Sequence, residues 1–321
     1  MTLSPLTWVI GGGGLLGTNV ERAIALRGEV WRPARSIAWG TPDARSQLAT
    51  AVAQFASRVG DHPWQVAWCA GAGVTTTTAD LLAEEARLFD AVLEALSERM
   101  RPGSDGAAFL ASSAGGLYAG SSSPPFTEES PVSPVSPYGK TKLHLERTLS
   151  EWAAAYGWPV VVGRIANLYG AGQNLWKTQG LISQICRAHL LRRPVSIYVP
   201  LDTIRDYLYA RDCGELVAEM LTRARQDPRA LCSTAQIKIL ASQQGVTIGA
   251  LLAEARRVLK QRIKVAHAPS TTAGRYQAQD LRLRSVVWPE LDRRALTPLP
   301  VGIRATTNHL MRQIQLGSVR A

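Results

Sequence analysis

The segment Trp8-Val-Ile-Gly11-Gly-Gly-Gly14-Leu-Leu-Gly17 places three glycines at GxxGxxG spacing. An apolar run over Thr7–Ile10 predicts a strand before them, and a helical pattern follows over Leu15–Arg27. In a dinucleotide site the first glycine permits a tight turn, the second lets the backbone approach the pyrophosphate, and the third lets helix and strand pack closely. Flexible turns also use glycine runs, but the strand and helix context favours a dinucleotide site. We therefore predict cofactor contacts at Gly11, Gly14, Leu15, Leu16 and Gly17.

The first half of the chain alternates short apolar runs with helical patterns, which is typical of a parallel sheet covered on both faces. We expect further strands over Glu29–Ala34, Gln65–Cys69, Ala107–Ala111 and Pro159–Gly163, and helices over Arg45–Val59, Ala79–Arg99 and Tyr138–Tyr156. After Arg164 the pattern loosens. It still predicts a strand over Val195–Tyr198 and helices over Leu181–Leu191, Cys213–Arg223, Ile248–Lys260 and about Val301–Ile314.

These patterns predict an α/β fold: a Rossmann-type doubly wound parallel sheet with a small C-terminal α/β substrate lobe. We place a dinucleotide-binding domain at residues 1–170. Residues 171–321 would then be mostly the substrate-binding lobe, with some chain returning to the sheet. A cleft between the two is the expected binding site.

Composition fits a soluble globular protein with a sizeable core. Of the 321 residues, 46% are hydrophobic and 19% are charged. No apolar run approaches the ~18 residues of a membrane span, and the N-terminus has no signal-peptide pattern. We therefore expect a cytoplasmic protein without a membrane partner. The cysteines (Cys69, Cys186, Cys213 and Cys232) lie far apart, so we expect neither a disulfide framework nor a metal site.

The formal net charge is +11, and thirty of the 36 basic residues are arginine. One interpretation is an attraction for phosphate-bearing ligands or nucleic acid. The other is a compositional bias of the source organism. No block of consecutive like charges and no nucleic-acid motif is present, so we expect no nucleic-acid partner.

The form of the cofactor depends on the end of the second strand. An acidic residue about 20 positions beyond the glycines would bind the ribose hydroxyls of NAD. Here Arg35 lies 18 residues after Gly17, Arg32 is close by, and no Asp or Glu occupies residues 30–40. Guanidinium groups suit the 2′-phosphate of NADP. Within NAD(P) we therefore favour NADP over NAD, the alternative being that Arg35 is a solvated surface residue.

Tyr138-Gly-Lys-Thr-Lys142 opens a helix after Ser136-Pro137. Its i,i+4 spacing puts Tyr138 and Lys142 on one helix face. A phenol with a pKa of ~10 is a poor base at neutral pH, but a nearby ammonium stabilises the phenolate and lowers that pKa. Proton transfer to or from a substrate hydroxyl then becomes feasible.

The chain resembles the extended short-chain dehydrogenase/reductases, specifically the NAD(P)-dependent sugar-nucleotide epimerase/dehydratase family. The motifs appear in family order from Val9 to about Gly214, roughly two thirds of the chain. They are Val9–Gly17, Phe109-Leu-Ala-Ser-Ser-Ala-Gly-Gly-Leu-Tyr118, Thr127–Pro131 leading to Pro137–Lys142, Arg164-Ile-Ala-Asn-Leu-Tyr-Gly170 and Arg205-Asp-Tyr-Leu-Tyr209.

The resemblance implies that Tyr138 and Lys142 are catalytic and also contact the cofactor. It also implies a Ser or Thr, four residues before Tyr118, that hydrogen-bonds the reacting sugar oxygen. That position is Ala114, which has no hydroxyl, while Ser113 lies one position earlier and Ser112 two. Either local geometry lets Ser113 serve, or the third catalytic residue is missing and the chemistry is altered. We assign Ser113 as the catalytic and substrate-binding hydroxyl.

Other roles also follow from the resemblance. Asn167, Arg205 and Arg275 would bind the substrate, with Arg205 at the nucleotide diphosphate; the alternative for Arg205 is an ion pair with Asp206 or Asp212. Ala70, Gly71 and Ala72 would line the cofactor. The helices at Ala79–Arg99 and Tyr138–Tyr156 form the dimer face in relatives, which predicts a homodimer.

The predicted function is therefore an epimerase or reductase that acts on a nucleotide-activated sugar through a 4-keto sugar. A dehydratase ranks last, because Ala114-Gly115-Gly116 offers no Asp-Glu pair for the extra acid/base step. Two alternatives remain. One is a cofactor-binding regulatory protein with altered catalysis, and the other is a reductase of a non-nucleotide carbonyl.

Overall fold

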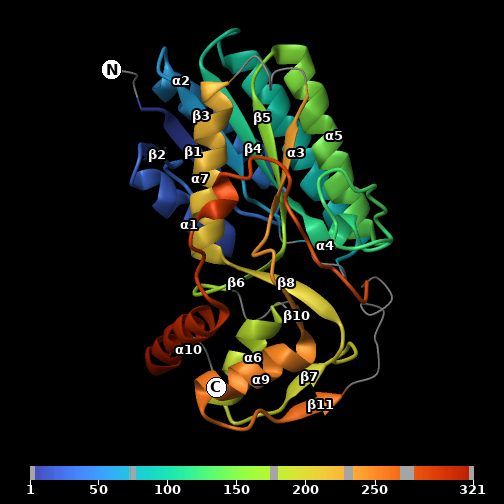
Figure 1. Ribbon diagram of the computed structural model, residues 1–321. Helices are drawn as coiled ribbons and strands as arrows, with labels where there is room; N and C mark the ends of the chain where they lie inside the picture. Colours follow the sequence, from blue (N-terminus) through green and yellow to red (C-terminus); the bar gives the residue numbers. More distant parts are fainter. Residues whose placement is uncertain are drawn as a thin grey trace.

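The computed structural model describes residues 4–71, 73, 77–173, 180–227, 234–267 and 278–317. A six-stranded parallel sheet is at its centre, in the order β2-β1-β3-β4-β5-β9 (Figure 1). The strands are β1 (Leu6–Ile10), β2 (Glu29–Trp31), β3 (Trp64–Trp68), β4 (Gly106–Ser113), β5 (Val160–Ile165) and β9 (Gln236–Leu240). The predicted Rossmann-type α/β fold is confirmed.

Helices cover both faces of this sheet. One face carries α2 (Ala44–Val59), α3 (Ala79–Arg99) and α5 (Pro137–Tyr156), and the other carries α1 (Leu15–Ala25) and α7 (Ala210–Gln226). Successive strand residues point to opposite faces. Trp8 and Ile10 therefore pack in the core beneath α2, α3 and α5, and Val9 packs in the core beneath α1 and α7. Burial on both sides explains why β1 and β3 are mostly apolar. Their buried polar residues, Thr7 and Gln65, share a hydrogen bond.

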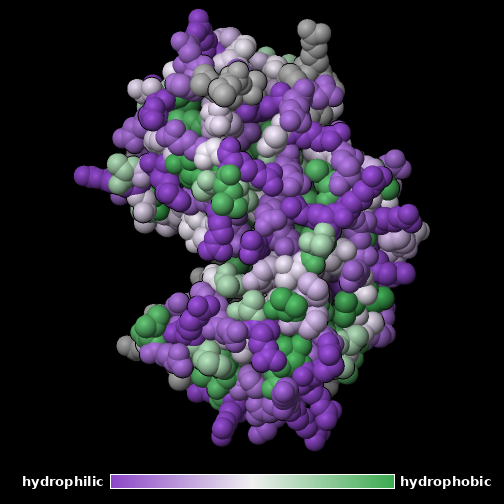
Figure 2. Space-filling model, turned by 60° about the vertical axis from the view of Figure 1, so that its left-hand side comes forward, coloured by the Kyte–Doolittle hydropathy of each residue, from purple (hydrophilic) through white to green (hydrophobic). Residues whose placement is uncertain are grey.

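A smaller lobe lies beyond the carboxyl ends of the strands (Figure 1). In it β8 (Ile204–Tyr209) pairs with β6 (Asn167–Tyr169) and β10 (Gly245–Thr247), and β7 (Val195–Ile197) pairs with β11 (Val265–His267). Its helices are α6 (Leu181–Leu190), α9 (Ile248–Leu259) and α10 (Leu299–Gln315), which share one apolar core. Figure 2 shows the surface indented between the larger part and this lobe.

Two strands end at other residues than predicted. β2 ends at Trp31, three residues before the predicted Ala34, since Pro33 has no N–H to donate to a strand ladder. β4 continues to Ser113, past the predicted Ala111. The chain also returns to the larger part after the first strands of the lobe: α7 packs on α1, and β9 joins β5 at the edge of the sheet.

The described residues also form two short helical elements, α4 (Ala114–Leu117) and a 3₁₀ turn at Leu291–Arg293. None of the helices in the described part of the chain is long and apolar enough to cross a membrane. The same residues contain no group of three or more His, Cys, Asp and Glu side chains that could hold a metal ion.

Candidate active site

The glycine loop joins β1 to α1 in a compact turn. Gly11 has a φ of 88°, a conformation that favours glycine. A Cβ on Gly17 would lie 2.1 Å from the carbonyl oxygen of Gly11. Helix α1 therefore begins pressed against the turn, as the GxxGxxG spacing predicted.

The same loop leaves room for an anion. A Cβ on Gly13 would have nothing within 4 Å. Gly14, the N-cap of α1, provides no side-chain hydrogen bond to the first turn, so the N–H groups at the helix start have no side-chain cap. Backbone N–H groups at a helix start, with open space before them, fit a pyrophosphate.

The loops after β1 and β3 meet at the switch point of the sheet. A Cβ on Gly11 would lie 2.6 Å from the backbone nitrogen of Ala70, and β1 separates β2 from β3. Ligands of open α/β sheets bind at such points. Of the other cofactor residues predicted in this loop, Gly71 lies beside Ala70, and Ala72 lies outside the described residues.

The arginines predicted to bind a 2′-phosphate have different surroundings. Arg32 forms an ion pair with Glu21 at 2.6 Å, and this hydrogen bond and charge raise the pKa of Arg32. Arg35 is exposed in the segment after β2. The sequence analysis did not predict the role of Glu21. Its position between Val20 and Ile24, on the buried face of α1, could have indicated a carboxylate with a charged partner.

Tyr138 lies in the first turn of α5. Ser136 caps this helix by accepting a hydrogen bond from the backbone N–H of Gly139 at 3.0 Å. The Tyr138 ring packs against two glycines: a Cβ on Gly116 would lie 3.1 Å from it, and a Cβ on Gly73 3.2 Å. Lys142, one turn further on, places Nζ 5.8 Å from the centre of the ring. The structure thus brings Tyr138 and Lys142 together, at the loops after β3 and β4.

Lys142 also has a partner that the sequence did not reveal. Its Nζ donates to Oε1 of Glu85, on α3, at 2.8 Å, and both side chains are almost fully buried. Burial lowers the pKa of Lys142, but the charge and hydrogen bond of Glu85 and the charge of Tyr138 outweigh burial and raise it. The sequence feature that could have indicated this pair is the position of Glu85 between Leu82 and Phe89, on the buried face of α3.

The hydroxyls at the end of β4 point in different directions. Ser112 donates to Glu146 at 2.6 Å inside the protein. Ser113 accepts from the backbone N–H of Gly116 at 3.1 Å and is half-buried, which leaves its hydroxyl proton available. Ala114 is fully buried in an apolar cluster with Tyr118. Of these two serines, Ser113 is therefore the one whose hydroxyl does not bind a buried carboxylate. The turn that follows it packs on the Tyr138 ring through Gly116.

A buried ion pair fixes α5 on the sheet. Arg164, in β5, donates to Glu146 through Nη2 at 2.7 Å and through Nε at 3.1 Å, and to the hydroxyl of Tyr118 at 2.8 Å. Burial lowers the pKa of Arg164, but the hydrogen bond and charge of Glu146 dominate and raise it. Because Glu146 lies one turn beyond Lys142, this pair sets the register of the Tyr138–Lys142 face.

The predicted substrate residues lie at the start of the smaller lobe. Asn167 donates to the backbone oxygen of Asp206 at 3.0 Å. The neighbouring Arg205 is buried in β8, donates to the backbone oxygen of Ile204 at 2.8 Å, and has its pKa lowered by burial. Asp206 accepts from the backbone of Ser242 and Gln244. Arg275 lies outside the described residues.

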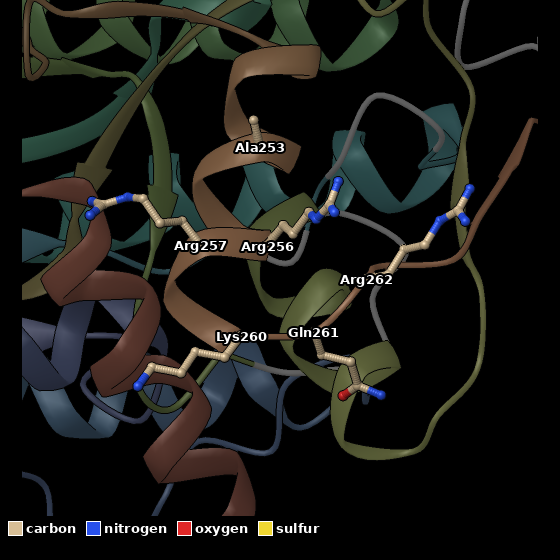
Figure 3. A pocket seen from close by; sticks show the side chains of 6 residues that line it. All are labelled: Ala253, Arg256, Arg257, Lys260, Gln261 and Arg262. Carbon is tan, nitrogen blue, oxygen red and sulfur yellow. The ribbon is translucent and has the colours of Figure 1, made fainter.

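A second hollow, of about 410 Å³, lies in the smaller lobe at the end of α9. Its lining carries four basic side chains: Arg256, Arg257, Lys260 and Arg262. Figure 3 shows Arg257 and Lys260 pointing to one side and Arg256 and Arg262 to the other. Arg257 is also paired with Glu254 at 2.6 Å. The cations do not converge on a common point, so this hollow is a solvated basic surface rather than a built anion site.

Residues 7–231 match the model of the NAD dependent epimerase/dehydratase family. The chain belongs to this family. Among curated relatives, the dTDP-glucose 4,6-dehydratase of Haemophilus influenzae is 35% identical over 104 residues, which cover 32% of this chain and 30% of the relative. The UDP-glucose 4-epimerase of Azospirillum brasilense is 35% identical over 136 residues, 38% of each chain. The aligned segments thus span only about a third of these relatives.

Solved structures of the family share the whole fold. The UDP-glucose 4-epimerase of Thermus thermophilus, in complex with NAD, has a TM-score of 0.76 and is 22% identical, covering 95% of this chain and 99% of the other. An epimerase of Methanothermobacter thermautotrophicus has a TM-score of 0.79 and is 19% identical, covering 98% and 94%. At these identities the likeness shows the fold, including the smaller lobe of this family member.

Proposed function

We propose that this family member is an NAD(P)-dependent epimerase or reductase that acts on a nucleotide-activated sugar through a 4-keto sugar. The observation that carries the proposal is the position of Tyr138 beside Lys142 on α5. Both lie at the carboxyl-end edge of the sheet, where the glycine loop follows β1. The family match and the nucleotide-sugar names of its relatives support it.

The proposed mechanism assigns one task to each side chain. The glycine loop after β1 would hold the dinucleotide, which when bound would supply the reversible hydride acceptance that oxidation of the sugar carbinol requires. Tyr138 removes the proton of that hydroxyl and later returns it. Lys142 stabilises the phenolate, and since an ammonium has three donors, its bond to Glu85 leaves two for the ribose hydroxyls of the cofactor. Ser113 donates to the reacting sugar oxygen.

Substrate binding is assigned to the smaller lobe. Asn167, Arg205 and Arg275 are the proposed contacts, with the guanidinium of Arg205 at the diphosphate, because this group forms strong charge-assisted hydrogen bonds to phosphate oxygens. Burial of Arg205 lowers its pKa, so a bound anion would repay part of its desolvation. The sugar would then lie between this lobe and Tyr138.

For the cofactor form we propose NADP over NAD, with Arg35 at the 2′-phosphate. Arg32 is already paired with Glu21, so Arg35 carries this proposal. In Arg35→Ala we expect the affinity for NADPH to fall roughly tenfold or more, as for loss of a hydrogen bond to a charged group. The affinity for NADH should not change. Isothermal titration of both nucleotides measures this, and equal effects on the two would contradict it.

The decisive experiment combines binding and turnover. We expect NADPH to raise the melting temperature by mass action, and one of the UDP-, GDP- or dTDP-sugars to raise it further. With that sugar, Tyr138→Phe should lower kcat by about 10²–10⁴-fold without loss of cofactor binding. Tyr156→Phe, at the exposed end of the same helix, is the matched control and should leave kcat unchanged.

A second candidate is a cofactor-binding protein with altered or absent turnover. The observation that favours it is Ala114, which is buried among apolar side chains at the position where the family resemblance implies a catalytic hydroxyl. Cofactor binding without activity across the sugar-nucleotide panel would support this candidate. A third outcome, turnover of small ketones without binding of free UDP or GDP, would instead indicate a reductase of non-nucleotide carbonyls.

A further inference from the structure

Glu85 connects α3 to the catalytic helix at the point where the chemistry is proposed. Its Oε1 accepts from Lys142 Nζ at 2.8 Å, although the two residues are 57 positions apart. The carboxylate also lies beneath the loop after β3. A Cβ on Gly71 would be 2.8 Å from Oε1, and a Cβ on Gly73 would be 3.4 Å from Oε2. The Lys142 ammonium therefore has both a carboxylate and the Tyr138 ring as neighbours.

The other ionisable groups near the ammonium are already compensated or neutral. Glu146, on α5, is bound through both oxygens by Arg164 of β5. Cys69, after β3, is half-buried, and this burial raises the pKa of its thiol well above neutral pH. Among these groups Glu85 is the carboxylate that forms an ion pair with Lys142, so its charge opposes that of the ammonium most directly.

We propose that Glu85 is a positioning residue that anchors Lys142 and cancels much of its charge, so that Tyr138 ionises at a higher pH than it would beside an unpaired lysine. This inference rests on the proposed Tyr138–Lys142 chemistry. A nearby ammonium favours a phenolate, and a nearby carboxylate disfavours it.

The test measures ionisation of Tyr138 directly and needs no substrate. The tyrosinate absorbance is followed against pH, and subtracting the curve of Tyr138→Phe isolates this phenol from the other tyrosines. In Glu85→Gln, which keeps the shape and removes the charge, we expect the midpoint to fall by about one pH unit. Glu84→Gln is the matched control: Glu84 is exposed on the same helix and pairs with the neighbouring Arg87, so the midpoint of this variant should equal that of the parent.

Removal of a buried counter-charge can prevent folding. A second pair of variants therefore compares a charged and a neutral side chain at position 85. Glu85→Asp and Glu85→Asn have equal length and differ in charge, and the midpoint should be lower in the asparagine variant. An unchanged midpoint in Glu85→Gln, or equal midpoints in the shorter pair, would overturn the inference. So would a shift of the same size in Glu84→Gln.

Turnover separates this inference from the proposed function. In an active enzyme the acid limb of kcat/KM should move to lower pH in Glu85→Gln, in step with the absorbance midpoint. If Tyr138→Phe abolishes turnover while Glu85→Gln leaves the midpoint in place, only the role of Glu85 fails. A shifted midpoint in a protein that turns over no sugar nucleotide supports the role of Glu85 and contradicts the proposed function.

Discussion

Gly17 and Gly13 belong to one loop but carry different constraints. A Cβ on Gly17 would collide with the Gly11 carbonyl at 2.1 Å, and main chain cannot move aside as a flexible side chain can. We expect Gly17→Ala to lower the free energy of unfolding by about 1–3 kcal/mol, the usual cost of overpacking, and to weaken dinucleotide binding. Urea unfolding and cofactor titration measure the two effects.

Gly13→Ala is the matched control, because its Cβ would meet nothing within 4 Å. Its unfolding free energy should stay within about 0.5 kcal/mol of the parent, as for most surface substitutions. Dinucleotide binding should still weaken, since the methyl group occupies the space proposed for the pyrophosphate. Equal destabilisation by the two substitutions would contradict this account of the loop.

At the scale of elements, Asp206 joins β8 to the turn between β9 and β10. It accepts from the backbone of Ser242 at 2.7 Å and of Gln244 at 3.1 Å. Burial raises the pKa of Asp206 to about 6, although these hydrogen bonds act in the opposite direction. In the unfolded chain the pKa returns to about 4. The folded state therefore binds more protons between about pH 4 and pH 6.

The sign of the resulting pH effect follows from linkage. The contribution of Asp206 to stability is fully present below about pH 4 and is lost as the pH rises through about 6, at most about 3 kcal/mol in total. Asp206→Asn should lack this slope, so the parent should lose more stability than the variant between pH 4 and pH 7. Urea unfolding across this range measures the difference. Asp202→Asn, in the same lobe but exposed, should keep the slope of the parent, and a parallel slope in Asp206→Asn would contradict the assignment.

At the scale of the whole molecule, the homodimer predicted through α3 and α5 would bring charged faces together. Glu84, Arg87 and Glu94 on α3 and Arg147 and Glu151 on α5 are exposed. Because salt screens exposed charges, we expect a dimer that weakens at high ionic strength and that Arg147→Glu disrupts. Light scattering after size exclusion measures the mass.

The control for this prediction is Arg58→Glu, an exposed substitution on α2, which should leave the mass unchanged. A monomer at every protein concentration would contradict the homodimer. A dimer that persists in Arg147→Glu would place the interface on another face of the molecule.

The sequence by itself determined the features that depend on neighbours along the chain. The GxxGxxG loop and the Tyr138–Lys142 pair each lie within one turn or one helix, where backbone geometry fixes which residues meet. Apolar runs and helical spacing were sufficient for the fold class, because burial on two faces leaves its own pattern. The match of the family model to residues 7–231 agrees with this interpretation.

Only the tertiary structure decided the contacts between distant segments. Glu85 meets Lys142 across 57 positions and Arg32 turns back to Glu21, while Ser112 reaches Glu146 across 34 positions and leaves Ser113 as the available hydroxyl. No local pattern specifies such pairs. The Glu85–Lys142 pair forms because packing α3 and α5 on one face of the sheet buries their polar side chains together, and buried charges must find partners.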